Sequence, residues 1–362
     1  MINSYKNFNN KKIIITGHSG FKGSWLTIWL LRYGAKIVGI SKDIPTNPSH
    51  YVSLNINQKI KEYFIKLEDE KKLKKIIQKE QPDFIFHLAA QAIVKRSYLN
   101  PLETWKSNTF GTLSLLESLR VIKKKVYVVI VTSDKAYKNL ELDRGYKESD
   151  ILGGDDPYSA SKGAVEILTN SYIKSFFKKK TSNVSVAIAR AGNVIGGGDW
   201  SNFRLIPDCV KSWSKNKKVL IRNPKSTRPW QHVMEVLSGY LTLAVLLQRN
   251  NKLHGEAFNF GPSLKNKLNV INVVKKMKFY WEKVEWKILK QKKTFHESKL
   301  LQLNSKKSKN KLNWNCVLDA DKTIQLVSEW YKSYYSTKRK KHILTLKQIE
   351  YYENILKKNR KI

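Results

Sequence analysis

Two short stretches of the sequence carry side chains that can exchange protons. Ser133, Asp134 and Lys135 follow an apolar run, and Tyr158 and Lys162 are four residues apart in the segment DPYSASKGAVEIL (156–168). On a helix, Tyr158 and Lys162 would share one face. A nearby ammonium favours the phenolate of a tyrosine, and lowering its pKa from about 10 to about 7 requires about 4 kcal/mol. We therefore predict an acid–base site built from both stretches.

The acid and the amine stand at the predicted tip of a strand over 127–133. Side chains alternate between the two faces of a strand, so Asp134 and Lys135 cannot both be functionless side chains exposed on the same face. Taken alone, Asp134 and Lys135 could also form an exposed ion pair at a strand end worth less than about 1 kcal/mol, and Tyr158 and Lys162 could be a surface pair without a function. A glycine loop earlier in the chain favours catalysis instead.

That loop, TGHSGFKG (16–23), has the spacing GxxGxxG between a short apolar strand and an apolar helix. Glycines permit a tight turn, let the backbone approach a pyrophosphate, and let the helix pack on its strand. The helix N-terminus then offers free N–H groups to the phosphates. The loop thus predicts a dinucleotide site, with the predicted cofactor contacts Gly17, Ser19, Gly20, Phe21 and Gly23.

A ribose-binding acid is expected at the end of the second strand. Asp43 is the one candidate there, and its neighbour Lys42 could tolerate a 2′-phosphate. This position alone therefore leaves the choice between NAD and NADP open.

The elements that must position these groups alternate between strand and helix. Apolar runs predict strands over 11–17, 35–40, 84–90, 127–133 and 184–190. Helices are predicted over 25–34, 68–80, around 101–122 and from Pro157. This alternation, with few tight hairpins, is typical of an α/β fold with a doubly wound parallel sheet of the Rossmann type.

After about residue 190 the chain is rich in glycine, proline and tryptophan. Segments 192–200, 222–232 and 258–262 are predicted to be loops that hold a ligand. We expect a dinucleotide-binding domain over 1–190 that carries the catalytic residues. A smaller substrate-binding part over 191–340 would be interleaved with the last strands, and a basic helical tail over 341–362 would pack on the body.

Composition excludes several classes of protein. The 362 residues are 41% hydrophobic, which indicates a globular chain with a large core. Two cysteines, Cys209 and Cys316, and a polar N-terminus fit a cytoplasmic protein without a disulfide framework. The net charge of +39 comes from lysines spread along the chain, so we expect neither a nucleic-acid partner nor membrane insertion.

No cluster of residues has the spacing of a metal site, so no metal is predicted. The histidines His87, His232 and His296 are interpreted as structural or as neighbours of the cofactor or substrate. Trp200 and Trp230 are interpreted as packing residues.

Three motifs together resemble the extended short-chain dehydrogenase/reductase family, also known as the NAD-dependent epimerase/dehydratase family. They are TGHSGFKG (16–23), HLAAQ (87–91) and YSASK (158–162). Longer segments are similar to the CDP-glucose branch of the nucleotide-sugar 4,6-dehydratases within that family, and this likeness covers nearly the whole chain. They include residues 94–112, 132–137, 152–164, 190–200, 204–208, 227–233 and 344–352.

The resemblance implies a redox-neutral dehydration of CDP-D-glucose to CDP-4-dehydro-6-deoxy-D-glucose, an early step toward the deoxy sugars of surface polysaccharides. NAD would be bound tightly and regenerated in each turnover. Tyr158 would take the proton of the C4 hydroxyl, Asp134 would act as the acid and Lys135 as the base. Ser133 would hydrogen-bond the C4 oxygen. Because an ion pair between Asp134 and Lys135 would oppose a neutral acid and a neutral amine, reversed or shared acid and base roles stay open.

Further contacts are carried over from the family. Cofactor contacts would include Leu67, Leu88, Ala89, Ala90 and Gln91, besides Tyr158 and Lys162. Substrate contacts would be Arg96, Ser97, Asn193, Leu205, Ile206, Pro207, Arg222 and Arg228. Lys66 departs from the family, in which an aspartate often contacts the adenine amine. Relatives usually pair through the helices at about 101–120 and 158–178, so a homodimer or homotetramer is expected.

Two other functions are compatible with the sequence. The nearer one is a dehydratase or epimerase acting on another nucleotide sugar, with GDP-mannose as substrate. Lys135, where the thymidine-linked glucose dehydratases have a glutamate, makes that group less favoured. The second is a non-catalytic NAD-binding scaffold with a basic surface for polyanions, against which the intact Ser133, Tyr158 and Lys162 argue.

Overall fold

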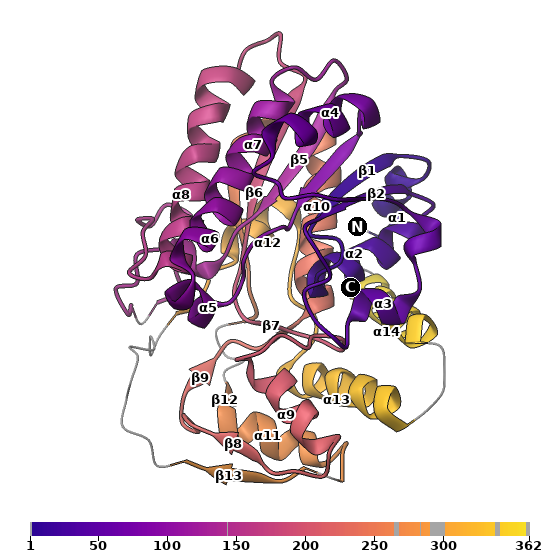
Figure 1. The fold of residues 1–362 in the computed structure, drawn as a ribbon, viewed down its shortest axis with the longest axis vertical. Coiled ribbons are helices and arrows are strands. Elements are labelled where there is room, and N and C mark those ends of the chain that lie inside the picture. Colours follow the sequence, from indigo (N-terminus) through magenta and orange to yellow (C-terminus); the bar gives the residue numbers. More distant parts are fainter. Residues whose placement is uncertain are drawn as a thin grey trace.

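A parallel sheet of seven strands runs through the centre of the computed structural model (Figure 1). The structure describes residues 2–142, 144–263, 268–282, 284–289, 301–336 and 341–359. The strand order is β11-β6-β5-β4-β1-β2-β3, and every neighbouring pair is parallel. The strands are β1 (Lys12–Thr16), β2 (Lys36–Ser41), β3 (Lys61–Phe64), β4 (Phe84–His87), β5 (Val126–Val131), β6 (Val184–Ala191) and β11 (Ala257–Phe260). The predicted fold class is confirmed.

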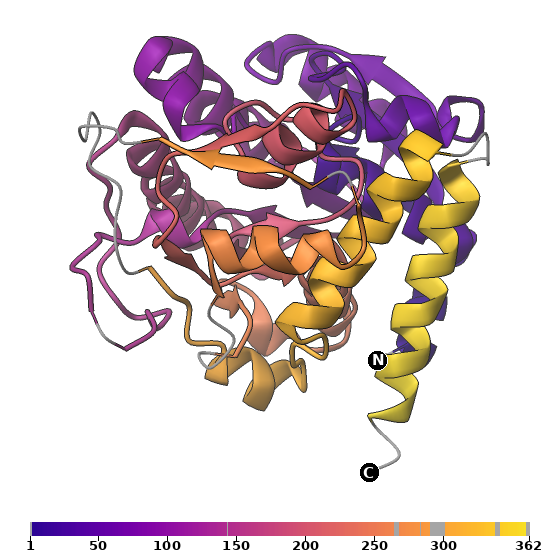
Figure 2. The same cartoon turned by 90° about the horizontal axis from the view of Figure 1, so that it is seen from below.

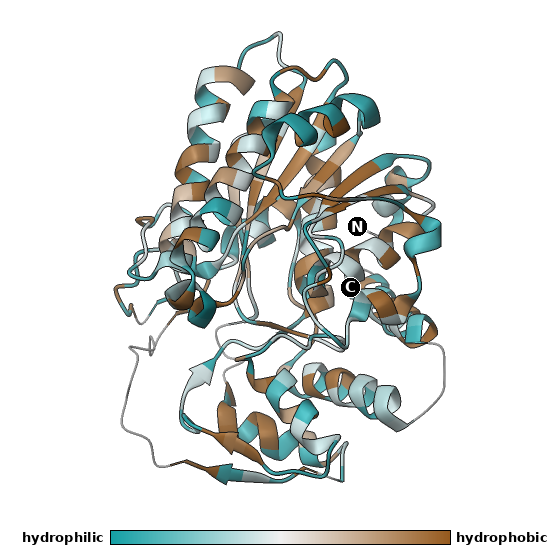
Figure 3. Cartoon of the chain, in the orientation of Figure 1, coloured by the Kyte–Doolittle hydropathy of each residue, from teal (hydrophilic) through white to brown (hydrophobic). Residues whose placement is uncertain are grey.

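The central strands are buried on both faces, which explains why they read as continuous apolar runs (Figure 3). Alternate residues of β1 enter different cores: Ile13 and Ile15 pack on one side of the sheet and Ile14 on the other. The edge strand β3 was not predicted, because its residues are mostly exposed or half-buried.

Helices cover both faces of this sheet (Figure 1). One face carries α4 (Glu70–Glu80), α7 (Gly111–Leu119) and α8 (Pro157–Tyr172), whose apolar residues share a core with Ile14. The opposite face carries α2 (Phe21–Arg32) and α10 (Val233–Arg249), and α14 (Lys341–Lys358) packs against α2 in the same core. The predicted helix around 101–122 is divided into α6 (Pro101–Trp105), a π-helical turn (Lys106–Phe110) and α7.

Smaller elements form the lower part of the molecule in Figure 1. This part holds α9 (Leu205–Trp213), α11 (Val270–Lys278) and α13 (Ala320–Ser336). It also contains three short strand pairs: β7 (Val194–Ile195) with β10 (Gln231–His232), β8 (Val219–Ile221) with β13 (Trp286–Ile288), and β9 (Thr227–Arg228) with β12 (Leu268–Asn269).

Between β10 and β12 the chain returns to the large sheet, where α10 packs on one face and β11 forms an edge strand. The loop predicted over 258–262 is therefore wrong in part, because Phe258–Phe260 belong to β11. The remaining helical segments are short. They are α1 (Ile2–Tyr5), α3 (His50–Leu54), α5 (Val94–Leu99), α12 (Lys306–Leu312), and the turns at 6–8, 57–59, 134–136, 173–177 and 251–253.

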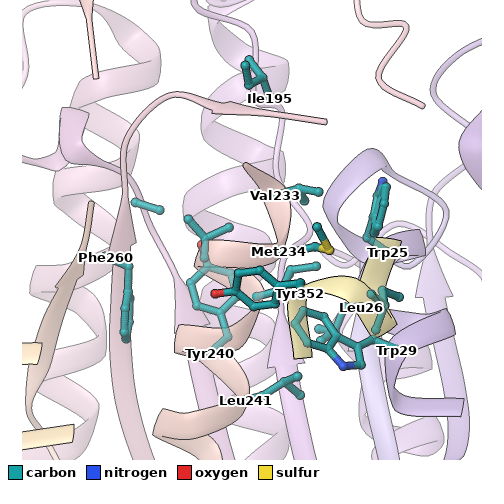
Figure 4. Close-up of a cluster of buried hydrophobic side chains, with 14 of the residues drawn as sticks. Trp25, Leu26, Trp29, Ile195, Val233, Met234, Tyr240, Leu241, Phe260 and Tyr352 are labelled. Atoms are coloured by element: carbon teal, nitrogen blue, oxygen red, sulfur yellow. The ribbon is translucent and has the colours of Figure 1, made fainter. Parts of the chain in front are cut away.

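The C-terminal helix α14 lies against α2, and beside α13 in the view of Figure 2, as predicted for the tail. Glu353 accepts hydrogen bonds from Trp29 Nε1 (2.8 Å) and from the Tyr33 hydroxyl (2.7 Å). Tyr352 enters the cluster of Figure 4, where its ring packs edge-on against Trp29. The helix thus completes the core over α2 and α10.

A buried carboxyl joins α10 to the C-terminal segments. Glu235 accepts hydrogen bonds from the main-chain N–H of Val317 (2.9 Å) and Leu318 (2.7 Å) and from the Tyr352 hydroxyl (2.7 Å). Burial raises the pKa of Glu235 to about 7, although these hydrogen bonds favour the ionised form. The folded protein therefore holds a proton here that the unfolded chain releases at lower pH.

We expect Glu235→Gln to flatten the pH dependence of stability. Because the folded pKa is raised, the stability that Glu235 contributes is full below about pH 4.5 and is lost as the pH rises through about 7. From pH 5 to pH 8 the wild-type protein should lose about 2–3 kcal/mol of unfolding free energy relative to the variant. Urea unfolding of both proteins at the two pH values measures this difference, and an equal loss in both would contradict it.

Candidate active site

The predicted catalytic residues gather where the central strands end. In a parallel sheet the carboxyl ends of all strands lie along one edge, and ligands bind there. Here the glycine loop follows β1, residues 88–91 follow β4, Ser133–Lys135 follow β5, and Asn193 follows β6. The order of these strands in the sheet brings the four segments side by side.

The acid and the amine lie on a turn beyond the strand. Strand β5 ends at Val131, and Asp134–Ala136 form a 3-10 turn. Ser133 begins this turn: its Oγ accepts a hydrogen bond from Lys135 N (3.2 Å) and donates one to Asp134 Oδ1 (2.9 Å). The prediction that the pair ends a strand is thus wrong by two residues, and the turn, not strand alternation, sets the two side chains apart.

Burial favours the protonated form of Asp134. It raises the pKa of the carboxyl, while Lys135, the Ser133 hydroxyl and Lys22 pull the pKa in the opposite direction. Gly192 makes room for this carboxyl, because a Cβ there would lie 3.1 Å from Asp134 Oδ2. Lys135 is only half-buried. A neutral acid beside a solvent-reachable amine can serve proton transfer in either direction.

Helix α8 begins at Pro157 as predicted, and Asp156 caps it by accepting from Tyr158 N (3.0 Å) and Ser159 N (2.9 Å). The Ser133 hydroxyl is near enough to the Tyr158 phenol to pull its pKa downward. One turn further on, the buried Lys162 donates to the Val131 carbonyl (3.4 Å), and burial lowers its pKa to about 8.

The phenol of Tyr158 is not acidified in the protein alone. Burial raises its pKa to about 12, and this outweighs the Ser133 hydroxyl and the positive charge of Arg204. A positively charged ligand beside the ring would be needed to lower it.

The glycine loop is packed too tightly for side chains. Gly17 has φ +75°, and a Cβ there would lie 2.8 Å from the main-chain nitrogen of Ala89. A Cβ on Gly23 would lie 2.0 Å from the Gly17 carbonyl oxygen. Gly20 precedes α2, and no side chain caps this helix. Its first N–H groups therefore suit a phosphate.

A cavity of about 550 Å³ lies beyond the ends of β2 and β3. Lys42, Asp43 and Lys66 line it, and Leu67 is buried beside it. The last residue of β2 is Ser41, whose hydroxyl is hydrogen-bonded to His18 Nδ1 (2.8 Å). The Asp43 main-chain oxygen accepts from Ser19 Oγ (2.6 Å), and its side chain is exposed. The loop, the uncapped helix and this cavity together fit a dinucleotide.

The segment after β4 is held by an asparagine that the sequence reasoning missed. Asn108 lies in the π-helical turn, accepts from Gln91 N (2.7 Å) and donates to Ser161 Oγ (2.9 Å) on α8. Leu88, Ala89 and Ala90 are half-buried. A π-helical turn often marks a functional site, and the turn was the structural signal that sequence periodicity could not show.

Two more missed cations belong to the site. The positive charge of Lys22, on the first turn of α2, lowers the pKa of Asp134. Burial, together with the like charge of Lys162, lowers the pKa of Lys22 itself to about 8. Arg204 forms an ion pair with Asp199 (2.8 Å), and its positive charge lowers the pKa of Tyr158. Lys22 lies in the motif TGHSGFKG (16–23) and Arg204 in the segment 204–208, but only the folded chain brings them near Asp134 and Tyr158.

The predicted substrate residues occupy varied positions. Arg96 is exposed and pairs with Glu103 (3.1 Å), and Ser97 is buried with its hydroxyl donating to Val94 O (2.7 Å). The others lie around the lower part of the molecule. Asn193 adjoins β7, Leu205 begins α9, Ile206 and Pro207 are buried in α9, Arg222 follows β8, and Arg228 lies in β9.

The histidines and tryptophans singled out in the sequence are packing residues where the structure describes them. His87 contacts the hydroxyls of Thr16 (2.8 Å) and Thr112 (2.9 Å). His232 caps α10, and Trp200 and Trp230 are buried in the main core. His296 lies outside the described residues. Among the described residues, no group of three acidic, histidine or cysteine side chains could hold a metal ion.

Comparison with known proteins places the chain in a family. The sequence model of the family described as GDP-mannose 4,6 dehydratase matches residues 14–327. The chain belongs to this family. Its sequence is 40% identical over 334 residues to CDP-glucose 4,6-dehydratase of Salmonella typhimurium, and the match covers 91% of this chain and 93% of the relative. It is also 29% identical over 281 residues to dTDP-D-glucose 4,6-dehydratase of Dictyostelium discoideum, covering 74% of this chain and 61% of the relative.

Solved structures of other proteins share the fold of this chain. An epimerase of Methanothermobacter thermautotrophicus superposes with a TM-score of 0.80 at 21% identity, covering 92% of this chain and 95% of the other. The dTDP-glucose 4,6-dehydratase of Streptomyces venezuelae has a TM-score of 0.74 at 19% identity, covering 89% and 97%. Within the described ranges, no helix has the length and apolar character to cross a bilayer.

We expect Gly23→Ala to unfold or strongly destabilise the protein, because its Cβ would overlap a backbone oxygen that cannot move independently. The expected loss is at least about 2 kcal/mol of unfolding free energy. Gly20→Ala is the matched control, since its Cβ would meet Gly17 O only at 3.3 Å. Thermal unfolding compares the two variants, and equal melting temperatures would contradict the packing described.

Proposed function

We propose that this protein is an NAD-dependent nucleotide-sugar 4,6-dehydratase that converts CDP-D-glucose to CDP-4-dehydro-6-deoxy-D-glucose and water. The observation that carries this proposal is the 40% identity to a CDP-glucose 4,6-dehydratase over 91% of the chain. The juxtaposition of Ser133, Asp134, Lys135 and Tyr158 at one strand edge supports the same chemistry. The family model supports a 4,6-dehydration without deciding the nucleotide.

Binding of the cofactor would fall to the glycine loop and the segments beside it. The uncapped N-terminus of α2 would receive the pyrophosphate, and the cavity beyond β2 and β3 would receive the adenosine. NAD, when bound, accepts a hydride from C4 of the sugar and later returns it to C6. The Streptomyces venezuelae dehydratase of the same fold was solved with NAD bound.

Oxidation at C4 requires a base for the hydroxyl proton. Tyr158 would take this proton while Ser133 hydrogen-bonds the same oxygen. The charge of Arg204 favours the phenolate, and a positively charged ring beside Tyr158 would lower its pKa further. Lys162, with a pKa of about 8, stays largely protonated at pH 7 and can donate to ligand hydroxyls.

Loss of water requires an acid and a base over neighbouring carbons. The C4 ketone acidifies C5, so Lys135 would remove the C5 proton, and the electrons of that bond would form the C5–C6 double bond. As the C6–O bond breaks, Asp134 would give its proton to the departing hydroxyl, which leaves as water. The raised pKa of Asp134 favours this role. Addition of hydride at C6 and a proton at C5 completes the product.

The nucleotide diphosphate would be held by the lower part of the molecule, which contains the residues predicted to contact the substrate after about residue 190. Arg228 and Arg222 carry guanidinium groups that match phosphate oxygens. We also infer a cytoplasmic location. The two cysteines are unpaired, as expected in a reducing compartment.

We infer a homodimer, or a homotetramer of two such dimers, formed through α6, α8 and the π-helical turn. Large apolar side chains are exposed on this surface, namely Leu102 (65% exposed), Phe110 (54%) and Ile167 (62%). A second copy of the same helices would cover them, since exposed apolar clusters mark interaction surfaces.

A turnover panel tests the proposed function. CDP-glucose, dTDP-glucose, UDP-glucose and GDP-mannose are each incubated with the purified protein, and 4-keto products are detected by their absorbance in alkali. We expect CDP-glucose to be consumed fastest, with NAD released from the denatured protein. Preferred turnover of GDP-mannose would assign the protein to the alternative substrate, and no turnover with steeply salt-dependent polyanion binding would favour the scaffold alternative.

Two variants separate the chemical steps. Tyr158→Phe should abolish C4 oxidation, because no base remains for the hydroxyl proton. Lys135→Ala should permit oxidation but slow the loss of water by about 10²–10⁴-fold, the usual contribution of a positioned base. Exposed Lys138 and the helix residue Tyr172 supply the matched controls Lys138→Ala and Tyr172→Phe. Normal dehydration by Lys135→Ala would refute the base assignment.

A further inference from the structure

A buried ion pair adjoins the turn that carries the acid and the amine. Arg190, on β6, and Glu166, on α8, have exposures of 3% and 0%. The Arg190 Nε donates to both carboxylate oxygens (2.8 and 2.9 Å), and Nη2 donates to Oε2 (2.5 Å). The pair therefore joins α8, which carries Tyr158, to β6, the neighbour of β5. Its two-pronged hydrogen bonding fixes the orientation of the two side chains relative to each other.

Both ends of the Ser133–Ala136 segment are bonded to this one pair. On the near side, the Thr132 hydroxyl donates to Glu166 Oε1 (2.6 Å). On the far side, Arg190 Nη1 donates to the Tyr137 hydroxyl (2.5 Å). The four residues between Thr132 and Tyr137 include the acid and the base of the proposed reaction.

The Tyr137 side of this network is itself anchored. Its hydroxyl donates to Asn259 Oδ1 (2.8 Å) on β11, and the Arg190 guanidinium lies 4.6 Å from the ring centre. Arg190 also donates to the Glu148 carbonyl (3.1 Å). The Tyr137 hydroxyl cannot be displaced without breaking or straining two hydrogen bonds.

Stability alone is a weak reason for such a pair. Desolvation of two charges is costly, and well-packed apolar residues of similar volume are often as stable or more stable. What an ion pair adds is direction, since each bond holds its partner at one angle and distance. Glu166 is also one turn after Lys162 on α8. The same carboxylate therefore sets the position of the tyrosine–lysine pair relative to the Asp134–Lys135 turn.

We propose that Glu166 and Arg190 are positioning residues for the dehydration, which hold the Ser133–Ala136 turn at both ends through Thr132 and Tyr137. This inference rests on the proposed function. The carboxyl and the amine must address neighbouring carbons while Tyr158 addresses the next one. A displacement of about 1 Å in such an arrangement can cost about 10²-fold in rate.

The test uses the outer partners, because loss of either member of a buried ion pair leaves an unpaired charge and risks unfolding. Tyr137→Phe removes one hydroxyl and keeps the ring. We expect the loss of water to slow by about 10–100-fold, with C4 oxidation slowed less than about threefold. Rapid quench of single turnovers with CDP-glucose, followed by mass spectrometry, should then show an oxidised hexose that still carries its C6 oxygen.

Tyr146→Phe is the matched control. Tyr146 is equally buried and its ring lies 5.1 Å from that of Tyr137, but its hydroxyl bonds to Asn139 and Leu140. A role limited to stability would slow both steps in parallel with the folded fraction, in both variants alike. Selective slowing of dehydration in Tyr137→Phe supports the inference, and behaviour identical to Tyr146→Phe overturns it.

Thr132→Val tests the other end of the turn and keeps the inference falsifiable if Tyr137→Phe does not fold. It removes the bond to Glu166 and preserves the shape of the side chain, and the same selective slowing is expected. An inert wild-type protein would overturn the proposed function and this inference together. An active wild-type protein with two normal variants would overturn the inference alone.

Discussion

The buried pair of Glu166 and Arg190 is the contact that ties together the elements of the site. It joins α8, β6 and, through Thr132, the end of β5. Two charges withdrawn from water cost several kcal/mol, and only a full set of hydrogen bonds offsets that cost. Thr132, Tyr137 and the Glu148 carbonyl provide these bonds, so the chain around the Ser133–Ala136 turn is arranged to satisfy the pair.

Burial shifts the main groups of the site toward their neutral forms. The pKa values of Asp134 and Tyr158 are raised, and that of Lys162 is lowered. For Asp134 this matches the proposed acid. For Tyr158 it opposes the proposed base, so the ligand must supply positive charge before the phenol can act. Such a dependence would couple oxidation at C4 to occupancy of the cofactor site.

The sheet could be predicted because its central strands are buried on both faces and read as apolar runs, as β5 does. The exposed edge strand β3 and the strand β11, whose Phe258–Phe260 precede glycine and proline, lack that pattern. Chemically distinctive residues such as Tyr158 and Lys162 were found from spacing and resemblance. Lys22, Arg204 and the Glu166–Arg190 pair were not, because their roles depend on which segments the folded chain brings together.

The most direct measurement follows one hydrogen atom through the reaction. CDP-glucose carrying deuterium at C4 is turned over by the wild-type protein, and the product is examined by NMR. If one phenol, one carboxyl and one amine act on three consecutive carbons, the deuterium must appear in the C6 methyl group, and a solvent proton must occupy C5. Deuterium that returns to C4, as in an epimerase, or that is lost from the sugar would contradict this account.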